Sequence, residues 1–246
     1  AEPLVAIVGH LDEIGLIITH IDEKGFLWFE PIGGWDPQIL VGQRVEVTGR
    51  EGIVPGVAGR KPIHLLEPDQ RKKVVELKSM HIDIGAADRD EAETMVRVGD
   101  PVVIRTEPLQ VAGSRLVSKS MDNRLGAFVA LESTRRCAEG KGPGGSMAGV
   151  AAVQEEIGLF GARTAAFELR PDIAVAVDVT HATDAPGVDE KEVGVHPLGS
   201  GPVIGRGSTL SPKVFELLVE TAEAEGIEYS IAASGRSTGT DADAIQ

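Results

Sequence analysis

The pattern of apolar and polar positions changes near residue 110. From there to the end, short continuous apolar runs alternate with helical patterns, which is typical of a parallel sheet covered by helices. GVAAV at 149–153 and IAVAV at 173–177 are too short for helices, so we expect central strands buried on both faces. LVAIV at 4–8 predicts another buried strand. The fold class we expect is α/β, with a mixed, mainly parallel sheet covered by helices.

Two helices of this region can be placed from their end signals. Ser211 and Pro212 suit the N-cap and first turn of a helix, and Gly226 suits its C-terminus. A second helix is predicted to follow Asn123 and to end near Gly140. We expect its apolar side to consist mostly of Leu125, Phe128, Val129 and Leu131.

From about residue 16 to about residue 109 the pattern is β-rich instead. GLIITHI, GFLWFEPI, QRVEVTG and DPVVIR predict strands separated by glycine-rich turns, and DEKG at 22–25 suits a hairpin loop. Asp88 and Glu91 predict a capping box for one short helix that runs through Met95. We expect residues 16–109 to form a small β-rich domain, inserted into an α/β domain of residues 1–15 and 110–246.

Composition excludes several function classes. The 246 residues include 38 acidic and 24 basic side chains, a net charge of −14, which argues against nucleic acid as a partner. Apolar residues make up 42% of the chain, enough for a hydrophobic core. The apolar runs fall short of the ~20 residues that cross a bilayer, and no basic signal segment opens the sequence. We expect a cytoplasmic protein without a membrane partner.

The termini and the single cysteine add two expectations. The sequence begins without Met, inside a strand-like run, and ends in what resembles the first turns of a helix, so we expect further sequence at both termini. Cys137 alone can form neither an intrachain disulfide nor a thiolate cage, so any metal would be held by histidine and carboxylate.

Four strand-like runs end directly in residues that bind metals: His10, Asp122, Glu155 or Glu156, and Asp178. Because the carboxyl ends of parallel strands line one crevice, we expect these side chains to converge. Three carboxylates so close together would repel one another unless a divalent cation compensated their charge. The pattern therefore predicts a metal site.

Spacing suggests a role for each of these residues. His10 and Asp12 are two positions apart and would point the same way in extended backbone, so Asp12 can accept the second ring proton of His10. Glu155 and Glu156 would point apart, one as a metal ligand and the other as a base for water. Asp122 could bridge two cations.

Each residue also has a simpler interpretation. A His-x-Asp pair is common, adjacent glutamates often form a solvated face or a first helical turn, and Asp178 could cap the next turn. The hypothesis of a metal site depends on all four segments meeting.

Several stretches resemble the M42 metallopeptidases, the tetrahedral aminopeptidases that include glutamyl aminopeptidases and some proteins labelled endoglucanase. These are GHLDEIG, SMDNR, QEEIGLFGA, DVTHATDAPG and GTDADAIQ, with GGWDP, KPIHLL and HIDIGAADRDEAE in the insert. The resemblance spans nearly the whole chain. It implies a zinc-peptidase-like fold, two divalent metal ions (Zn²⁺ first, Co²⁺ as the other choice), peptide substrates and an insert used for dimerisation. It also implies a homo-oligomer, a tetrahedral dodecamer built from dimers.

By this resemblance, His10 and Asp178 bind one metal, Glu156 binds the other and Asp122 bridges them. Glu155 resembles the general base, and Asp12 the residue that orients the histidine. The pair Thr240-Asp241 resembles a motif near the site, without a definite role. In the family the second metal takes one more histidine, which lies beyond the end of this sequence. His181 suits a turn beside the site, and His20, His64, His81 and His196 suit the surface or the insert.

The function expected from this resemblance is hydrolysis of N-terminal residues from peptides by a metal-activated water. Two alternatives remain open. A glycoside hydrolase of endoglucanase type also uses paired carboxylates. A catalytically silent assembly module would follow if the last histidine ligand were truly absent.

Overall fold

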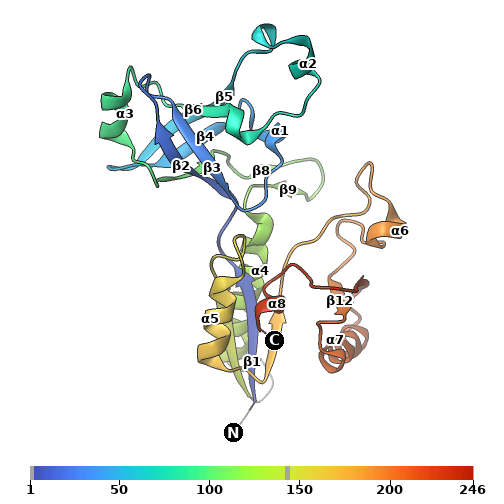
Figure 1. The fold of residues 1–246 in the computed structure, drawn as a ribbon. Helices are drawn as coiled ribbons and strands as arrows, with labels where there is room; N and C mark the ends of the chain where they lie inside the picture. Colours follow the sequence, from blue (N-terminus) through green and yellow to red (C-terminus); the bar gives the residue numbers. More distant parts are fainter. Residues whose placement is uncertain (1–2, 142–144, 246) are drawn as a thin grey trace. The chain divides into compact units, whose positions relative to one another are not determined.

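The computed structural model describes residues 3–141 and 145–245 and divides them into two compact units (Figure 1). The chain up to Asp12 and from Met121 onward forms one unit, called here the α/β unit. Residues 13–120 form the other, called the barrel unit. These boundaries lie 3 residues before the expected start of the insert and 11 residues after its expected end.

A three-stranded parallel sheet lies at the centre of the α/β unit. Strand β1 (Leu4–His10) pairs with β10 (Ser146–Ala152) on one side and with β11 (Ile173–Ala176) on the other. A second parallel pair joins β12 (Val203–Gly207) to β13 (Ser230–Ser234). The helices of this unit are α4 (Met121–Arg136), the π-helical turn η3 (Cys137–Lys141), α5 (Phe160–Leu169), α6 (Glu190–Val193), α7 (Pro212–Ala224) and α8 (Ala242–Ile245).

Small residues bring helix α4 very close to the sheet. A Cβ atom on Gly9 of β1 would lie only 2.2 Å from the carbonyl carbon of Gly126 in α4. On the other face of β1, Ala6 and Val8 form a core cluster with Ala162 of α5. The two helices therefore cover opposite faces of the central strand, and α4 begins beside the end of β1.

Two expectations about this unit were wrong in detail. In α4 the side chains Leu125, Phe128, Val129 and Leu131 are 41–64% exposed, and the buried positions are Asn123, Gly126, Ala127 and Ala130. The glycine and alanines among these positions allow the close approach of α4 to β1. Strands β10 and β11 are half-buried rather than buried on both faces, because they are the outer strands of the three. The predicted helix from Ser211 to Gly226 is confirmed as α7, with the Ser211 hydroxyl accepting the N–H of Val214 at 3.4 Å.

The barrel unit is a closed antiparallel barrel with strand order β2-β3-β6-β5-β4-β7. Its strands are β2 (Gly15–Ile21), β3 (Leu27–Ile32), β4 (Arg44–Thr48), β5 (Ile53–Arg60), β6 (Met80–Asp83) and β7 (Pro101–Ile104). Short elements connect them: α1 (Pro37–Leu40), η1 (Ile63–Leu65), α2 (Pro68–Arg71), η2 (Leu77–Ser79) and α3 (Arg89–Met95). A small ribbon of β8 (Leu109–Gln110) and β9 (Leu116–Val117) follows.

The patterns read from this region predicted β2, β3, β4, β7 and α3, but the sequence suggested only one short helix here, and α1 and α2 were not expected. The hairpin between β2 and β3 is confirmed, and so is the helix through Met95, whose N-cap Asp88 accepts the N–H of Glu91 at 2.9 Å. The Glu91 carboxylate accepts the N–H of Ala87 instead of the cap residue's own N–H. Because the barrel is antiparallel, the expectation of a mainly parallel sheet is not confirmed for the chain as a whole. Among the described residues no helix is long and apolar enough to cross a membrane.

Candidate metal centre

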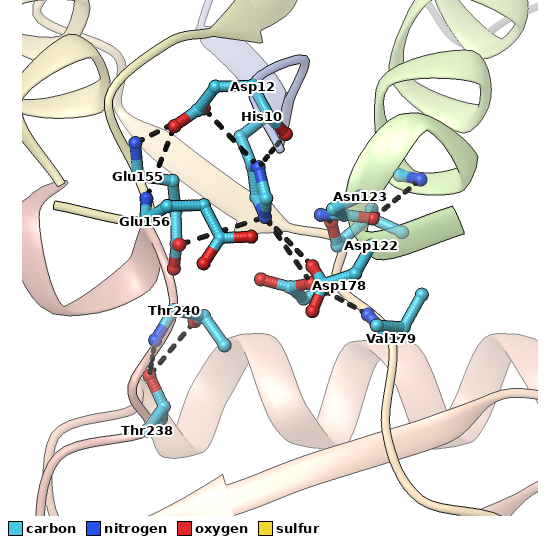
Figure 2. Close-up of polar contacts among 12 residues, drawn as sticks. His10, Asp12, Asp122, Asn123, Glu155, Glu156, Asp178, Val179, Thr238 and Thr240 are labelled. Atoms are coloured by element: carbon cyan, nitrogen blue, oxygen red, sulfur yellow. Dashed lines mark hydrogen bonds and ion pairs between the residues drawn. The ribbon is translucent and has the colours of Figure 1, made fainter. Parts of the chain in front are cut away.

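His10 lies at the C-terminal end of β1 and is 1% exposed. Its Nε2 atom is 3.1 Å from Oδ1 of Asp122, 3.8 Å from Oε2 of Glu155 and 4.0 Å from Oδ1 of Asp178 (Figure 2). The structure thus brings together side chains from four separate segments of the sequence. We refer to His10, Asp122, Glu155, Glu156 and Asp178 as the His10 cluster.

The parallel sheet explains why these segments meet. Strands β10 and β11 flank β1 in parallel, so the residues that follow them, Glu155 and Asp178, reach the same edge as His10. Asp122 comes instead from the start of α4, where it is joined to Asn123 by a cis peptide bond. The buried Asn123 amide donates to the carbonyl of Val177 at 2.7 Å and accepts the N–H of Gly126 at 2.8 Å. These bonds hold the start of α4 against the end of β11.

Asp12 connects the histidine to the glutamates. The Nδ1 atom of His10 is 3.2 Å from the backbone oxygen of Asp12 and 3.4 Å from its Oδ1. The Asp12 carboxylate also accepts the backbone N–H groups of Glu155 at 3.2 Å and Glu156 at 3.3 Å. The sequence suggested the contact with His10, but the two bonds to the glutamate backbone could not be foreseen from spacing.

The prediction that Glu155 and Glu156 point apart assumed an extended backbone, but the two residues lie in a turn. Gln154 has a φ of +62°, and the carbonyl of Glu155 accepts the N–H groups of Gly158 and Leu159 in a turn. Both carboxylates consequently lie near His10 (Figure 2). The Glu155 side chain is only 10% exposed, which rules out a solvated face.

Two groups of potential ligands share the histidine. One consists of His10, Asp122 and Glu156, and the other of His10, Glu155 and Asp178; within each group the ligand atoms lie within 4.8 Å of one another. Asp178 also accepts the N–H of Val179, so it caps its turn and faces His10 at once. The distances group Glu155 with His10 and Asp178 as a potential metal ligand. The resemblance to the M42 metallopeptidases instead implies that Glu155 is the general base.

The charges of the cluster oppose one another. Burial raises the pKa of Glu155 to about 7, and the charges of Asp178, Asp241 and Glu156 act in the same direction, while His10 lowers it. Burial likewise raises the pKa values of Glu156 and Asp178. Burial alone would lower the pKa of His10, but the surrounding carboxylates together raise it. A site with these properties favours a cation, which would compensate the clustered carboxylates.

The remaining histidines lie elsewhere. The exposed His181 belongs to neither ligand group among the described residues. His20 and His64 are exposed, and His81 packs edge-on against Phe26 in the barrel unit. His196 was expected at the surface or in the insert, and this was wrong, because it is 5% exposed in the α/β unit and its Nδ1 lies 2.8 Å from the Ser230 hydroxyl.

Sequence reasoning gave Asp241 no role, yet it is one of the most buried polar residues, with 2% exposure. Its electrostatic neighbours include His10, Asp178 and Asp12. The signal in the sequence was the GTDADAIQ stretch itself, but nothing in its spacing shows that the carboxylate is buried.

Comparisons with known proteins agree with this geometry. The M42 glutamyl aminopeptidase family model matches residues 1–246. A lysyl aminopeptidase of Pyrococcus furiosus is 35% identical over 247 residues, which are 99% of this chain and 69% of that protein. The chain spans from 56% to 69% of the length of the curated relatives it matches.

Solved structures show the same fold. A TET aminopeptidase from a marine sediment archaeon of the Thaumarchaeota is 37% identical with a TM-score of 0.90, covering 99% of this chain and 69% of that one. The TET1 peptidase of Pyrococcus horikoshii, described as assembling into a tetrahedron or a large octahedral shell, is 32% identical with a TM-score of 0.83, covering 99% of this chain and 72% of that one. A Thermotoga maritima structure titled endoglucanase is more distant, 24% identical with a TM-score of 0.67, and shows the fold alone.

Proposed function

The chain belongs to the M42 glutamyl aminopeptidase family, and we propose that its protein is a metal-dependent aminopeptidase that hydrolyses N-terminal residues from peptides. The observation that carries this function is the convergence of His10 with four carboxylates at one end of the α/β unit. Peptides are the substrates that lysyl and glutamyl aminopeptidase relatives suggest by their names.

The donor set fits a pair of divalent cations. One imidazole and several carboxylates in two overlapping groups are ligands that suit Zn²⁺ and also Co²⁺. We propose that His10, Asp122, Glu156 and Asp178 would hold the cations. Zn²⁺ is our first choice and Co²⁺ the second. The further histidine ligand implied by the family would come from sequence outside residues 1–246.

The chemistry of the reaction can be divided between the cations and the protein. When bound, a pair of divalent cations polarises the scissile carbonyl and lowers the pKa of water. We propose that Glu155 takes the proton from the attacking water and passes it to the leaving amine. Asp12 holds both the His10 ring and the backbone that carries Glu155, so it positions the base relative to the ligands.

Hydrolysis of aminoacyl nitroanilides by the protein in its natural full length tests this function. We expect release of nitroaniline, its loss after treatment with a chelator, and its return with Zn²⁺ or Co²⁺. Activity that survives complete removal of metal, or no activity with any aminoacyl group, would contradict the proposed function. Fewer than one bound cation per chain would instead favour the silent assembly module.

The structure gives little support to the glycoside hydrolase alternative. Such an enzyme needs two carboxyl groups roughly 5–9.5 Å apart across a sugar cleft. Here the carboxylates gather around one histidine. Both tryptophans, Trp28 and Trp35, belong to the barrel unit rather than to the unit that holds the cluster. Reducing-sugar release, measured beside anilide hydrolysis, separates the two activities.

We also propose that the protein forms a homo-oligomer through the barrel unit. Several large apolar side chains of this unit are more than half exposed, including Ile39, Ile53, Ile63, Leu65 and Val74. The TET1 peptidase of Pyrococcus horikoshii is described as assembling into a tetrahedron or a large octahedral shell, and the form we expect here is a tetrahedral dodecamer built from dimers. A cytoplasmic location remains a prediction.

A further inference from the structure

Asp241 is a buried carboxylate with no hydrogen-bond partner among the described residues. It is 2% exposed, and neither of its side-chain oxygens has a hydrogen-bond partner among the described residues. Asp100, the other deeply buried aspartate, accepts the N–H of Arg97 at 2.9 Å and pairs with its guanidinium at 3.2 Å. Burying a carboxylate with no partner is costly. Asp241 therefore calls for an explanation that Asp100 does not need.

The local structure around Asp241 does not use its carboxylate. The Asp243 carboxylate accepts the N–H groups of Thr238 at 2.9 Å and Gly239 at 2.8 Å, which closes the loop. The Thr240 hydroxyl accepts the N–H of Ala242 at 3.3 Å (Thr238 and Thr240 are drawn in Figure 2). An aspartate before a helix usually caps it, but neighbouring side chains fill that task here.

The charges near Asp241 are those of Asp12 and of members of the His10 cluster. His10, Asp178 and Asp12 act on Asp241, and Asp241 in turn acts on Glu155. Apart from His10, all these neighbours are acidic, so they repel the Asp241 charge. Together with burial, this repulsion favours a cation inside the cluster.

The cation that compensates Asp241 could be a bound metal ion or the amino group of a substrate, and the burial of Asp241 favours the metal ion. Both carboxylate oxygens are closed off from solvent, so the amino group of an arriving substrate cannot reach them. Asp122, by contrast, is 61% exposed and lies on the open side of the cluster. Asp241 belongs to neither ligand group found among the described residues, so we do not count it among the direct ligands.

We propose that Asp241 is an outer-sphere carboxylate of the metal centre, a positioning residue whose charge strengthens the binding of divalent cations by the His10 cluster. This role rests on the proposed function, because it requires that the cluster bind cations. The proposed role explains the burial of Asp241, which is not one of the ligands proposed for the cations.

The variant Asp241→Asn, made in the natural full-length protein, tests this role. Competition with a chelating dye should show Zn²⁺ binding about 10- to 100-fold weaker than in the wild type, the usual effect of losing an outer-shell carboxylate. The same variant should unfold at a higher temperature than the wild type when both are free of metal, since a repelled buried charge is removed. Unchanged Zn²⁺ affinity, or a variant that is less stable or does not fold without metal, would overturn the proposed role.

Two further variants separate charge from structure. Asp243→Asn alters a carboxylate in the same loop that does hold backbone N–H groups, so it should lower the melting temperature and leave Zn²⁺ affinity within about threefold. Asp241→Glu keeps the charge and should bind Zn²⁺ more tightly than Asp241→Asn. An equal loss of affinity in Asp243→Asn, or no difference between Asp241→Glu and Asp241→Asn, would count against an electrostatic role.

Peptidase activity of the wild type distinguishes this role from the proposed function. If the wild type binds Zn²⁺ but cleaves no aminoacyl nitroanilide, the function fails, while weaker Zn²⁺ binding by Asp241→Asn still supports the outer-sphere role. If the wild type is active and Asp241→Asn binds Zn²⁺ normally, the role of Asp241 fails alone. A wild type that binds neither Zn²⁺ nor Co²⁺ would overturn both.

Discussion

The two units of this chain are stabilised in different ways. The barrel unit buries large side chains such as Leu27, Leu40, Met80 and Ile82 in one continuous core. In the α/β unit the buried cluster around β1 consists of Ala6, Val8, Ala152 and Ala162, and the most buried groups at the strand ends are charged or polar. The barrel therefore depends on the burial of large apolar side chains. The core around β1 has small side chains, close backbone packing and a group of carboxylates at the strand ends. The stability of the α/β unit should depend on what the His10 cluster binds.

The largest effect expected in the α/β unit is on activity rather than stability. Glu155→Gln removes the carboxylate that we propose as the base but keeps the shape of the side chain, so turnover should fall by about 10³-fold or more while metal content stays nearly intact. Anilide hydrolysis and metal analysis measure the two quantities. Glu168→Gln, on the exposed side of α5, is the matched control and should keep full turnover. Substantial activity in Glu155→Gln would remove this residue from the mechanism.

In the barrel unit the largest effect should be on stability. Leu27 is fully buried, so Leu27→Ala should lower the free energy of unfolding by about 2–5 kcal/mol through lost burial and a new cavity. Because both tryptophans lie in this unit, urea unfolding followed by tryptophan fluorescence measures the change. Val98→Ala, at a position that is 61% exposed, should change it by no more than about 0.5 kcal/mol. Similar losses for both variants would contradict an apolar core as the main support of the barrel.

Removal of metal should make the α/β unit sensitive to pH. The pKa values of Glu155 and Asp241 in the folded protein are about 7 and about 6, above their ordinary values of 4.5 and 3.8, and that of His10 is also raised. Groups with a raised pKa stabilise the fold fully below their unfolded pKa, and this contribution is lost as pH rises through the folded pKa. The metal-free protein should therefore become less stable as the pH rises from about 4 to about 7.

Divalent metal should reverse this trend, because it binds the ionised carboxylates. Zn²⁺ at a concentration 100 times its dissociation constant should raise the free energy of unfolding by about 2.7 kcal/mol. Far-UV circular dichroism follows the helices, most of which lie in the α/β unit, while tryptophan fluorescence follows the barrel. We expect pH and metal to move the dichroism transition more than the fluorescence transition. If both transitions move together, the two units unfold as one, and the contrast between them does not extend to their stability.

A smaller effect should come from the close packing of α4. A Cβ atom on Gly126 would lie 2.1 Å from the carbonyl oxygen of Val177, so Gly126→Ala must push the start of α4 away from β11. We expect a loss of about 1–3 kcal/mol, together with weaker Zn²⁺ binding, because Asp122 moves relative to His10. Gly34→Ala, where the added atom meets open space, is the control and should change neither property. A stable Gly126→Ala variant with normal Zn²⁺ affinity would show that close packing does not position Asp122.

Much of this protein could be predicted from the sequence alone. Alternating apolar positions placed the hairpin of the barrel, and capping residues placed α3 and α7. Strand-like runs that end in His10, Asp122, Glu155 or Glu156, and Asp178 predicted that these residues would meet. They do meet, although Asp122 comes from the start of α4 and not from the end of a strand. Such inferences succeed because they depend on near neighbours in the sequence and on one general property of parallel sheets, that strand ends share an edge.

Only the tertiary structure decided the rest. The buried face of α4 consists of Asn123, Gly126, Ala127 and Ala130, because the backbone of β1 approaches too closely for its larger residues. The bonds from Asp12 to the backbone of Glu155 and Glu156 join residues more than 140 positions apart, and the burial of Asp241 depends on how its loop packs. Periodicity describes which residues are apolar but not how near two backbones come, and in the α/β unit that distance determines which side chains surround His10.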